Sequence, residues 1–106
     1  MTSDSKAYVR AVLEMYARTP NTIMPRTSDR RLAADLYDQS VPLATIEAAL
    51  LLATARRLSR SPDLPALPTI RSLAYFSPVI EEIRRQPLPS HYVDYLRHKV
   101  SATPSR

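Results

Sequence analysis

Few side chains in this sequence have the type and spacing that catalysis or metal binding requires. The chain has two histidines and no cysteine. His91 and His98 are seven residues apart, which places them about 10 Å apart on one helix, too far to share a metal ion. Glu81 and Glu82 are adjacent and point in different directions, so they do not form a general acid–base pair. No serine has a recognisable histidine–carboxylate arrangement. We therefore expect no enzyme, and neither a metal nor a cofactor.

Basic side chains are the chemically distinctive group. Lysine and arginine total 15 against 10 aspartates and glutamates, and the formal net charge of +5 favours polyanionic partners. The basic residues gather in four groups: Arg26, Arg30 and Arg31; Arg56, Arg57 and Arg60; Arg84 and Arg85; and Arg97 and Lys99. Several stand near expected helix ends, where one shared rim would hold a phosphate backbone without reading its sequence. A set of solvated charges at helix C-termini, or a general bias towards arginine, is the alternative interpretation.

Two tyrosines add an aromatic contact to this hypothesis. Tyr92 and Tyr95 are expected to stay partly exposed beside Arg97 and Lys99, where they could stack on bases or anchor a protein partner. The predicted nucleic-acid-binding residues are Arg56, Arg57, Arg60, Arg84, Arg85, Tyr92, Arg97 and Lys99.

The absence of glycine excludes several function classes. Glycine-rich phosphate loops and the dinucleotide fingerprint need backbone conformations that only glycine adopts readily. No apolar run approaches the roughly 20 residues of a membrane span, and the N-terminus lacks the pattern of a signal peptide. We expect a cytoplasmic protein without a membrane partner.

A helix at about residues 41–59 is expected to organise the fold. Ser40 is its predicted N-cap, and Pro42 fits its first turn. Its large apolar residues lie on several sides, so other helices must surround it. These residues are Leu43, Ile46, Leu50, Leu51, Leu52 and Leu58.

Apolar periodicity predicts further helices on both sides of this element. They cover residues 5–18, 29–38, 69–86 and 91–100. The first is capped by Ser3 or Asp4, the third by Thr69 and the last by Ser90. We expect the third helix to be kinked at Pro78, or broken there with Ser77 capping its second piece. Residues 61–68 form a connector with several prolines, through which no helix can pass. The predicted fold is therefore all-α, a compact bundle of five or six helices in one domain over residues 1–100, with a disordered tail at 101–106.

The segment 31–50 has the outline of a helix-turn-helix. Its connection is long and lacks glycine, and its second helix presents leucine and alanine where a recognition helix needs polar side chains. We interpret that second helix as a core helix.

The order of elements resembles the DnaD-type domain of primosomal and phage replication-initiation proteins. The segments that carry the resemblance are YVRAVLEMYART, IMPRTSDRRLAADLYDQ, VPLATIEAALLLATARR and SLAYFSPVIEEI. In the last of these, Tyr75, Val79 and Ile83 occupy the places of the family's Tyr-x-x-x-Ile-x-x-x-Trp motif, with isoleucine where the family has tryptophan. The resemblance implies that Arg84, Arg85, Arg97 and Lys99, near and within the final helix, touch DNA.

These observations predict a small basic DNA-associated module, such as a replication-initiation or mobile-element accessory factor. It would hold DNA phosphates with little sequence preference and recruit a protein of the replication or transposition machinery. The alternative is a protein–protein adaptor or dimerisation module, a homo-oligomer with no nucleic-acid role.

Overall fold

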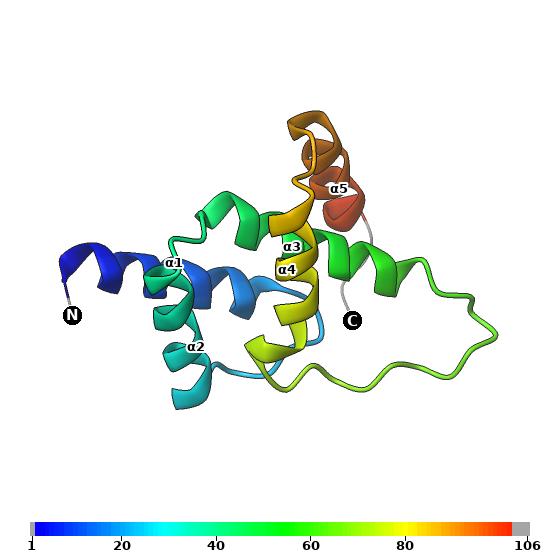
Figure 1. Ribbon diagram of the computed structural model, residues 1–106. Coiled ribbons are helices and arrows are strands. Elements are labelled where there is room, and N and C mark those ends of the chain that lie inside the picture. Colours follow the sequence, from blue (N-terminus) through cyan, green and yellow to red (C-terminus); the bar gives the residue numbers. More distant parts are fainter. Residues whose placement is uncertain (1, 103–106) are drawn as a thin grey trace.

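The computed structural model describes residues 2–102, and these form helices joined by irregular segments (Figure 1). The elements are α1 (Ser3–Arg18), α2 (Thr27–Asp38), α3 (Leu43–Leu58), the 3₁₀ helix η1 (Leu73–Phe76), α4 (Ser77–Arg85) and α5 (Ser90–Ala102). The predicted all-α bundle is confirmed. Within residues 2–102, no helix is both long enough and apolar enough to cross a lipid bilayer.

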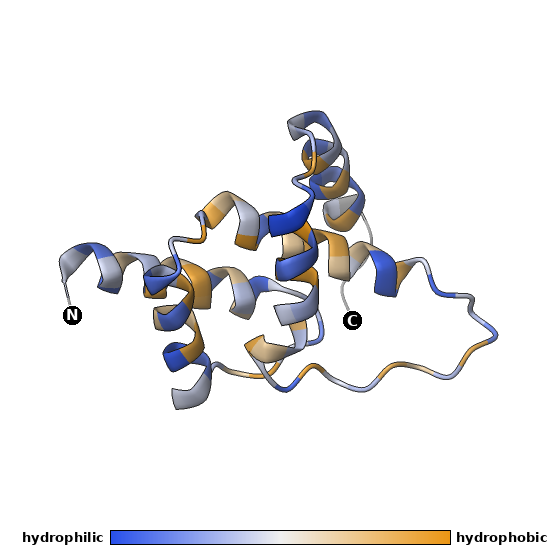
Figure 2. Ribbon diagram, in the orientation of Figure 1, coloured by the Kyte–Doolittle hydropathy of each residue, from blue (hydrophilic) through white to orange (hydrophobic). Residues whose placement is uncertain are grey.

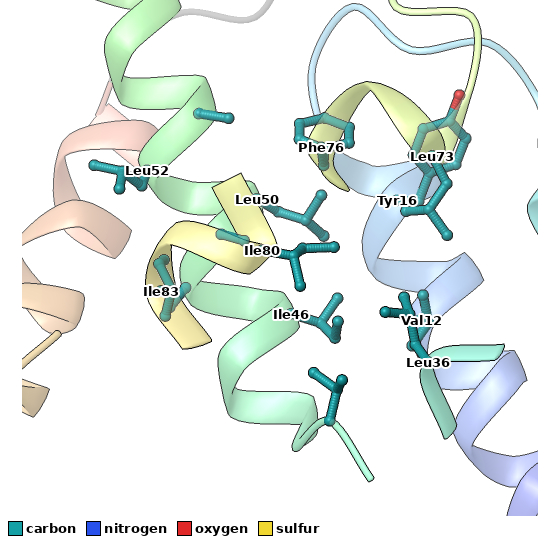
Figure 3. Close-up of a cluster of buried hydrophobic side chains, with 14 of the residues drawn as sticks. Val12, Tyr16, Leu36, Ile46, Leu50, Leu52, Leu73, Phe76, Ile80 and Ile83 are labelled. Carbon is teal, nitrogen blue, oxygen red and sulfur yellow. The ribbon is translucent and has the colours of Figure 1, made fainter. Parts of the chain in front are cut away.

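The middle of α3 is enclosed by the other helices, as predicted. It contacts α1, α4, α5 and η1, and Figure 3 shows Ile46 and Leu50 of α3 facing Val12 of α1. The buried residues of α3 are Ile46, Ala48, Ala49, Leu50, Leu52, Ala53, Thr54 and Ala55. The alanines allow neighbouring helices to approach closely, so the core forms around a helix with few bulky side chains.

The prediction of burial on all sides is wrong at the two ends of α3. Leu43 and Leu58 are each 39% exposed, and Leu51 is half-buried. The two exposed leucines occupy the first and last positions of the helix, where its neighbours no longer cover it.

Ser40 ends α2 rather than capping α3. Its backbone has φ 59°, and its N–H donates to the carbonyl of Tyr37 at 2.9 Å. The N–H of Val41 donates to the carbonyl of Leu36 at 3.1 Å. These two bonds form a Schellman motif, in which serine takes the left-handed position that glycine usually holds. Pro42 is the N-cap of α3 instead.

The other predicted caps also shift. Thr2 caps α1, with its Oγ1 accepting from the N–H of Ser5 at 3.1 Å, so neither Ser3 nor Asp4 is the cap. Ser90 is the first residue of α5 rather than its cap. Helix α5 continues to Ala102, two residues into the segment expected to be a disordered tail, and residues 103–106 of that segment lie outside the described residues.

The helix predicted for residues 69–86 is broken at Pro78, which confirms the second of the two alternatives, a kink or a break. Residues before this proline form η1, and α4 begins at Ser77 with the proline in its first turn. Ser77 has helical φ and ψ and is the first residue of α4, whose N-cap is Phe76. Thr69 precedes a parallel bridge between Thr22 and Ile70 rather than a helix.

The buried carboxylate of Asp29 fixes the position of η1. Its Oδ1 accepts from the N–H of Leu73, and its Oδ2 accepts from the N–H of Arg26, both at 2.8 Å. Asp29 is 1% exposed. The carboxylate therefore satisfies donors at the start of α2 and at the start of η1 simultaneously.

Candidate nucleic-acid interface

Three of the predicted arginines gather at the C-terminal end of α3. Arg56 and Arg57 lie in its last turn and Arg60 follows two residues after the helix ends. Figure 2 shows the hydrophilic C-terminal turn beyond the hydrophobic middle of this helix. Positive charge here complements the negative end of the helix dipole. We call Arg56, Arg57 and Arg60 the arginine cluster.

The arginine cluster surrounds a pocket of about 290 Å³. The remaining lining residues are Ala53, Leu67, Tyr75 and Val79. They come from α3, the connector, η1 and α4, so the pocket exists only when these elements pack together. Arginines beside apolar and aromatic side chains suit a group with both an anionic part and a planar part, such as a nucleotide.

Arg56 is paired with a carboxylate. Its Nη1 and Nη2 donate to Oε1 and Oε2 of Glu82 in α4, at 2.9 and 2.6 Å. Both side chains are about half exposed. The hydrogen bond to Glu82 raises the pKa of Arg56, and the same bond lowers the pKa of Glu82. A phosphate must therefore compete with this carboxylate for Arg56.

Arg57 and Arg60 donate to neutral oxygens. Arg57 donates to the hydroxyl of Tyr75 at 3.0 Å and to the carbonyl of Pro68 at 2.9 Å. Its guanidinium carbon also lies 5.5 Å from the centroid of the Tyr75 ring. Arg60 donates to the carbonyl of Pro65 at 2.9 Å. Within residues 2–102 neither arginine forms an ion pair, so their positive charges are not compensated by a contacting carboxylate.

The structure places Arg84 and Arg97 elsewhere. Arg84 donates to Gln39 at the end of α2 and to Glu81, both at 2.9 Å. Arg97 donates to Glu47 in the N-terminal half of α3 at 3.1 and 3.3 Å, and to Asp94 at 2.6 Å.

These contacts give Arg84 and Arg97 the role of joining helices. The hydrogen bonds that Arg97 donates to Glu47 and Asp94 raise the pKa of Arg97. The predicted arginines therefore do not share a single rim, because Arg84 and Arg97 bond to residues outside the arginine cluster.

Arg85 and Tyr92 lie near the Arg56–Glu82 pair. The charge of Arg85 contributes to the lowered pKa of Glu82, and Tyr92 contributes to the raised pKa of Arg56. Tyr92 stacks on Tyr95, with ring centroids 5.8 Å apart and 25° between the planes. Both rings are exposed, at 38% and 55%.

Arg85 and Tyr92 thus act electrostatically on the Arg56–Glu82 pair at the edge of the arginine cluster. Lys99 is half-buried in the last turn of α5, on the helix that Arg97 joins to α3. The expected partial exposure of Tyr92 and Tyr95 is confirmed, and Tyr92 also contributes to the raised pKa of Arg56.

Sequence reasoning missed Tyr75 as a surface residue, because it placed this tyrosine inside an α-helical apolar period. The side chain is 46% exposed and contacts Arg57. The 3₁₀ geometry of η1 shifts the period and leaves Tyr75 at the pocket. Pro78 was the available signal, since a proline in the first turn of a helix leaves the residues before it outside that helix.

Across residues 2–102, no group of three or more histidines, aspartates and glutamates is arranged to hold a metal ion.

A second groove of about 700 Å³ runs along α1, where the exposed side chain of Met24 lies with Lys6, Arg10 and Arg30.

No family model, curated protein sequence or solved structure matches this chain. The likeness to the DnaD-type domain therefore stays a prediction from the sequence.

Proposed function

We propose that this protein is a DNA-associated accessory module of replication initiation or of a mobile element. It binds the phosphate backbone through the arginine cluster, with Arg85 and Tyr92 alongside, and recruits a protein partner. The observation that supports this most is the pairing of Arg57 and Arg60 with neutral oxygens at a pocket that also exposes Tyr75. Their charges are available to phosphates without the loss of an ion pair.

The proposed binding mode has little sequence preference. Guanidinium groups on phosphates set the position of a protein on DNA but carry no base information. The helix with the outline of a recognition helix, α3, buries its middle in the core and cannot enter a groove. A base can stack on the exposed ring of Tyr75 or Tyr92, a contact that tolerates any base.

A salt titration of DNA binding tests this proposal. The affinity of the full chain for a fluorescent oligonucleotide, single- or double-stranded, is measured as salt is raised. The logarithm of the affinity should fall with a slope of about −0.9 per phosphate neutralised on duplex DNA. The double variant Arg57→Ala/Arg60→Ala should bind more weakly, with a slope shallower by about 1.8 on a duplex.

The matched control is Arg10→Ala/Arg18→Ala, which removes the same charge from exposed positions on α1. It should leave the slope within about 0.5 of the wild-type value, since it removes net charge but no contacted phosphate. No binding at about 50 mM salt, or an equal loss in the control, rules the proposal out.

The second candidate is an adaptor or dimerisation module with no nucleic-acid role. The stacked, exposed pair Tyr92 and Tyr95 favours it, because exposed aromatic residues often anchor protein interfaces. Sedimentation velocity with and without oligonucleotide separates the two candidates. A concentration-dependent dimer that ignores DNA supports the adaptor.

A further inference from the structure

The connector between α3 and η1 carries a regular proline repeat. Pro62, Pro65 and Pro68 are three residues apart, and a leucine precedes each of the last two. A polyproline II helix has three residues per turn, so prolines at this spacing share one face. Proline fixes its own φ and restricts the residue before it to extended conformations. Pro65 and Pro68 therefore restrict themselves and the preceding Leu64 and Leu67 to extended conformations before any partner binds, whereas Pro62 lies in a turn.

The segment projects from the helical body, as Figure 1 shows for the long loop after α3. It begins with a turn in which the N–H of Leu64 donates to the carbonyl of Ser61 at 3.1 Å. Residues 65–69 then run without helix or turn. Pro62, Pro65 and Pro68 are all exposed, and the side chain of Leu64 is 51% exposed.

Two arginines hold this segment by its backbone. Arg60 donates to the carbonyl of Pro65 and Arg57 donates to the carbonyl of Pro68, each at 2.9 Å. These carbonyls are one polyproline II turn apart. The half-buried side chain of Leu67 faces the pocket of the arginine cluster. Hydrogen bonds from Arg57 and Arg60 and the packing of Leu67 thus fix one side of the segment, while the proline rings remain exposed to solvent.

We propose that residues 64–68 are a docking segment for a protein domain with a groove lined by aromatic side chains. Such grooves recognise extended proline-rich segments, and a segment already fixed in its bound conformation loses little entropy on binding. The proposal specifies the class of protein partner that the chain recruits. It rests on the proposed function only in assuming that the chain recruits a partner.

The test uses the full chain without DNA and a panel of purified SH3 and WW domains. The chain has no tryptophan, so the tryptophan fluorescence of the domain reports binding without background. At least one domain should show a saturable change. Pro65→Ala and Pro68→Ala should each weaken that binding roughly tenfold or more, as loss of an anchoring side chain does.

Pro87→Ala and Pro89→Ala provide the matched control. These prolines are also exposed, but they lie two residues apart in the short connection between α4 and α5. The control variants should bind like the wild type, with circular dichroism confirming that every variant is folded. The proposal is overturned if no domain responds at up to about 1 mM, or if the controls weaken binding equally. No oligonucleotide is present in this experiment, so its outcome is independent of whether the chain binds DNA in the salt titration.

Discussion

The guanidinium group of Arg56 and the carboxylate of Glu82 form a two-point fork between α3 and α4, with N–O distances of 2.9 and 2.6 Å. Paired geometry of this kind is the strongest that an arginine makes with a carboxylate. It also holds Arg56 at the edge of the arginine cluster with its charge already neutralised. Glu82 therefore controls how many of the three arginines are available to an anion.

Glu82→Gln should strengthen DNA binding. The substitution removes the competing charge, so Arg56 can join Arg57 and Arg60 on the phosphate backbone. The slope of log affinity against log salt should steepen by about 0.9, which corresponds to one added duplex phosphate. Glu14→Gln is the control, because it removes the same charge beside Arg18 on α1. Unchanged affinity in Glu82→Gln would remove Arg56 from the interface.

The same pair predicts a pH dependence. The hydrogen bond from Arg56 lowers the pKa of Glu82 in the folded protein. A carboxylate with a lowered folded pKa stabilises the fold above its unfolded pKa, and this contribution disappears as pH falls through the folded value. A carbon-detected NMR titration should therefore find Glu82 titrating below the ordinary glutamate range. In Arg56→Gln its pKa should return towards that range, and an unaltered titration would contradict the role given to Arg56.

Tyr8 and Tyr16 should respond in opposite ways to loss of the hydroxyl. The Tyr8 hydroxyl donates to the carbonyl of Val41 at 2.8 Å, so Tyr8→Phe should cost about 0.5–1.5 kcal/mol. The buried Tyr16 hydroxyl has no hydrogen-bond partner within residues 2–102, and burial, followed by the charge of Asp29, raises its pKa.

Tyr16→Phe should therefore be neutral or stabilising by up to about 1 kcal/mol, since it removes an unsatisfied polar group. Urea unfolding of the two variants measures the contrast. A large loss of stability in Tyr16→Phe would indicate a water or ligand bonded to that hydroxyl.

Ser40→Gly should stabilise the protein. Ser40 has φ 59°, a conformation that costs a residue with a side chain about 1–2 kcal/mol and glycine much less. After the greater chain entropy of glycine is subtracted, a gain of about 0.5–1 kcal/mol is expected in thermal or urea unfolding. Ser59 ends α3 with φ −88°, so Ser59→Gly should bring no such gain. Equal effects at both positions would contradict this reasoning.

Helix positions were predictable from the sequence because apolar periodicity and proline placement act locally. The enclosed middle of α3 followed from leucines and alanines on several sides of one helix. The caps were less predictable, since serine is a favoured N-cap, whereas the left-handed position that Ser40 takes after α2 is one that glycine usually holds. The Schellman hydrogen bonds decide between these roles, and they depend on where Val41 packs.

The site was predictable only in part. The grouping of Arg56, Arg57 and Arg60 follows from their closeness in the sequence at the end of one helix. The partners of the arginines are not local. Glu82 lies 26 residues from Arg56, and Glu47 lies 50 residues from Arg97. Which arginines are neutralised therefore depends on helix packing, which periodicity does not specify.

The carboxylate of Asp29 joins the start of α2 to Leu73, 44 residues further along the chain. A bond across so long a stretch forms only after most of the chain has been brought together, because closing a long loop costs entropy before any contact compensates for it. Neither half of the protein can satisfy this buried group alone. We therefore expect the whole bundle to melt in one cooperative transition, with amide hydrogen exchange in α2 and at Leu73 slowed to the same global opening rate.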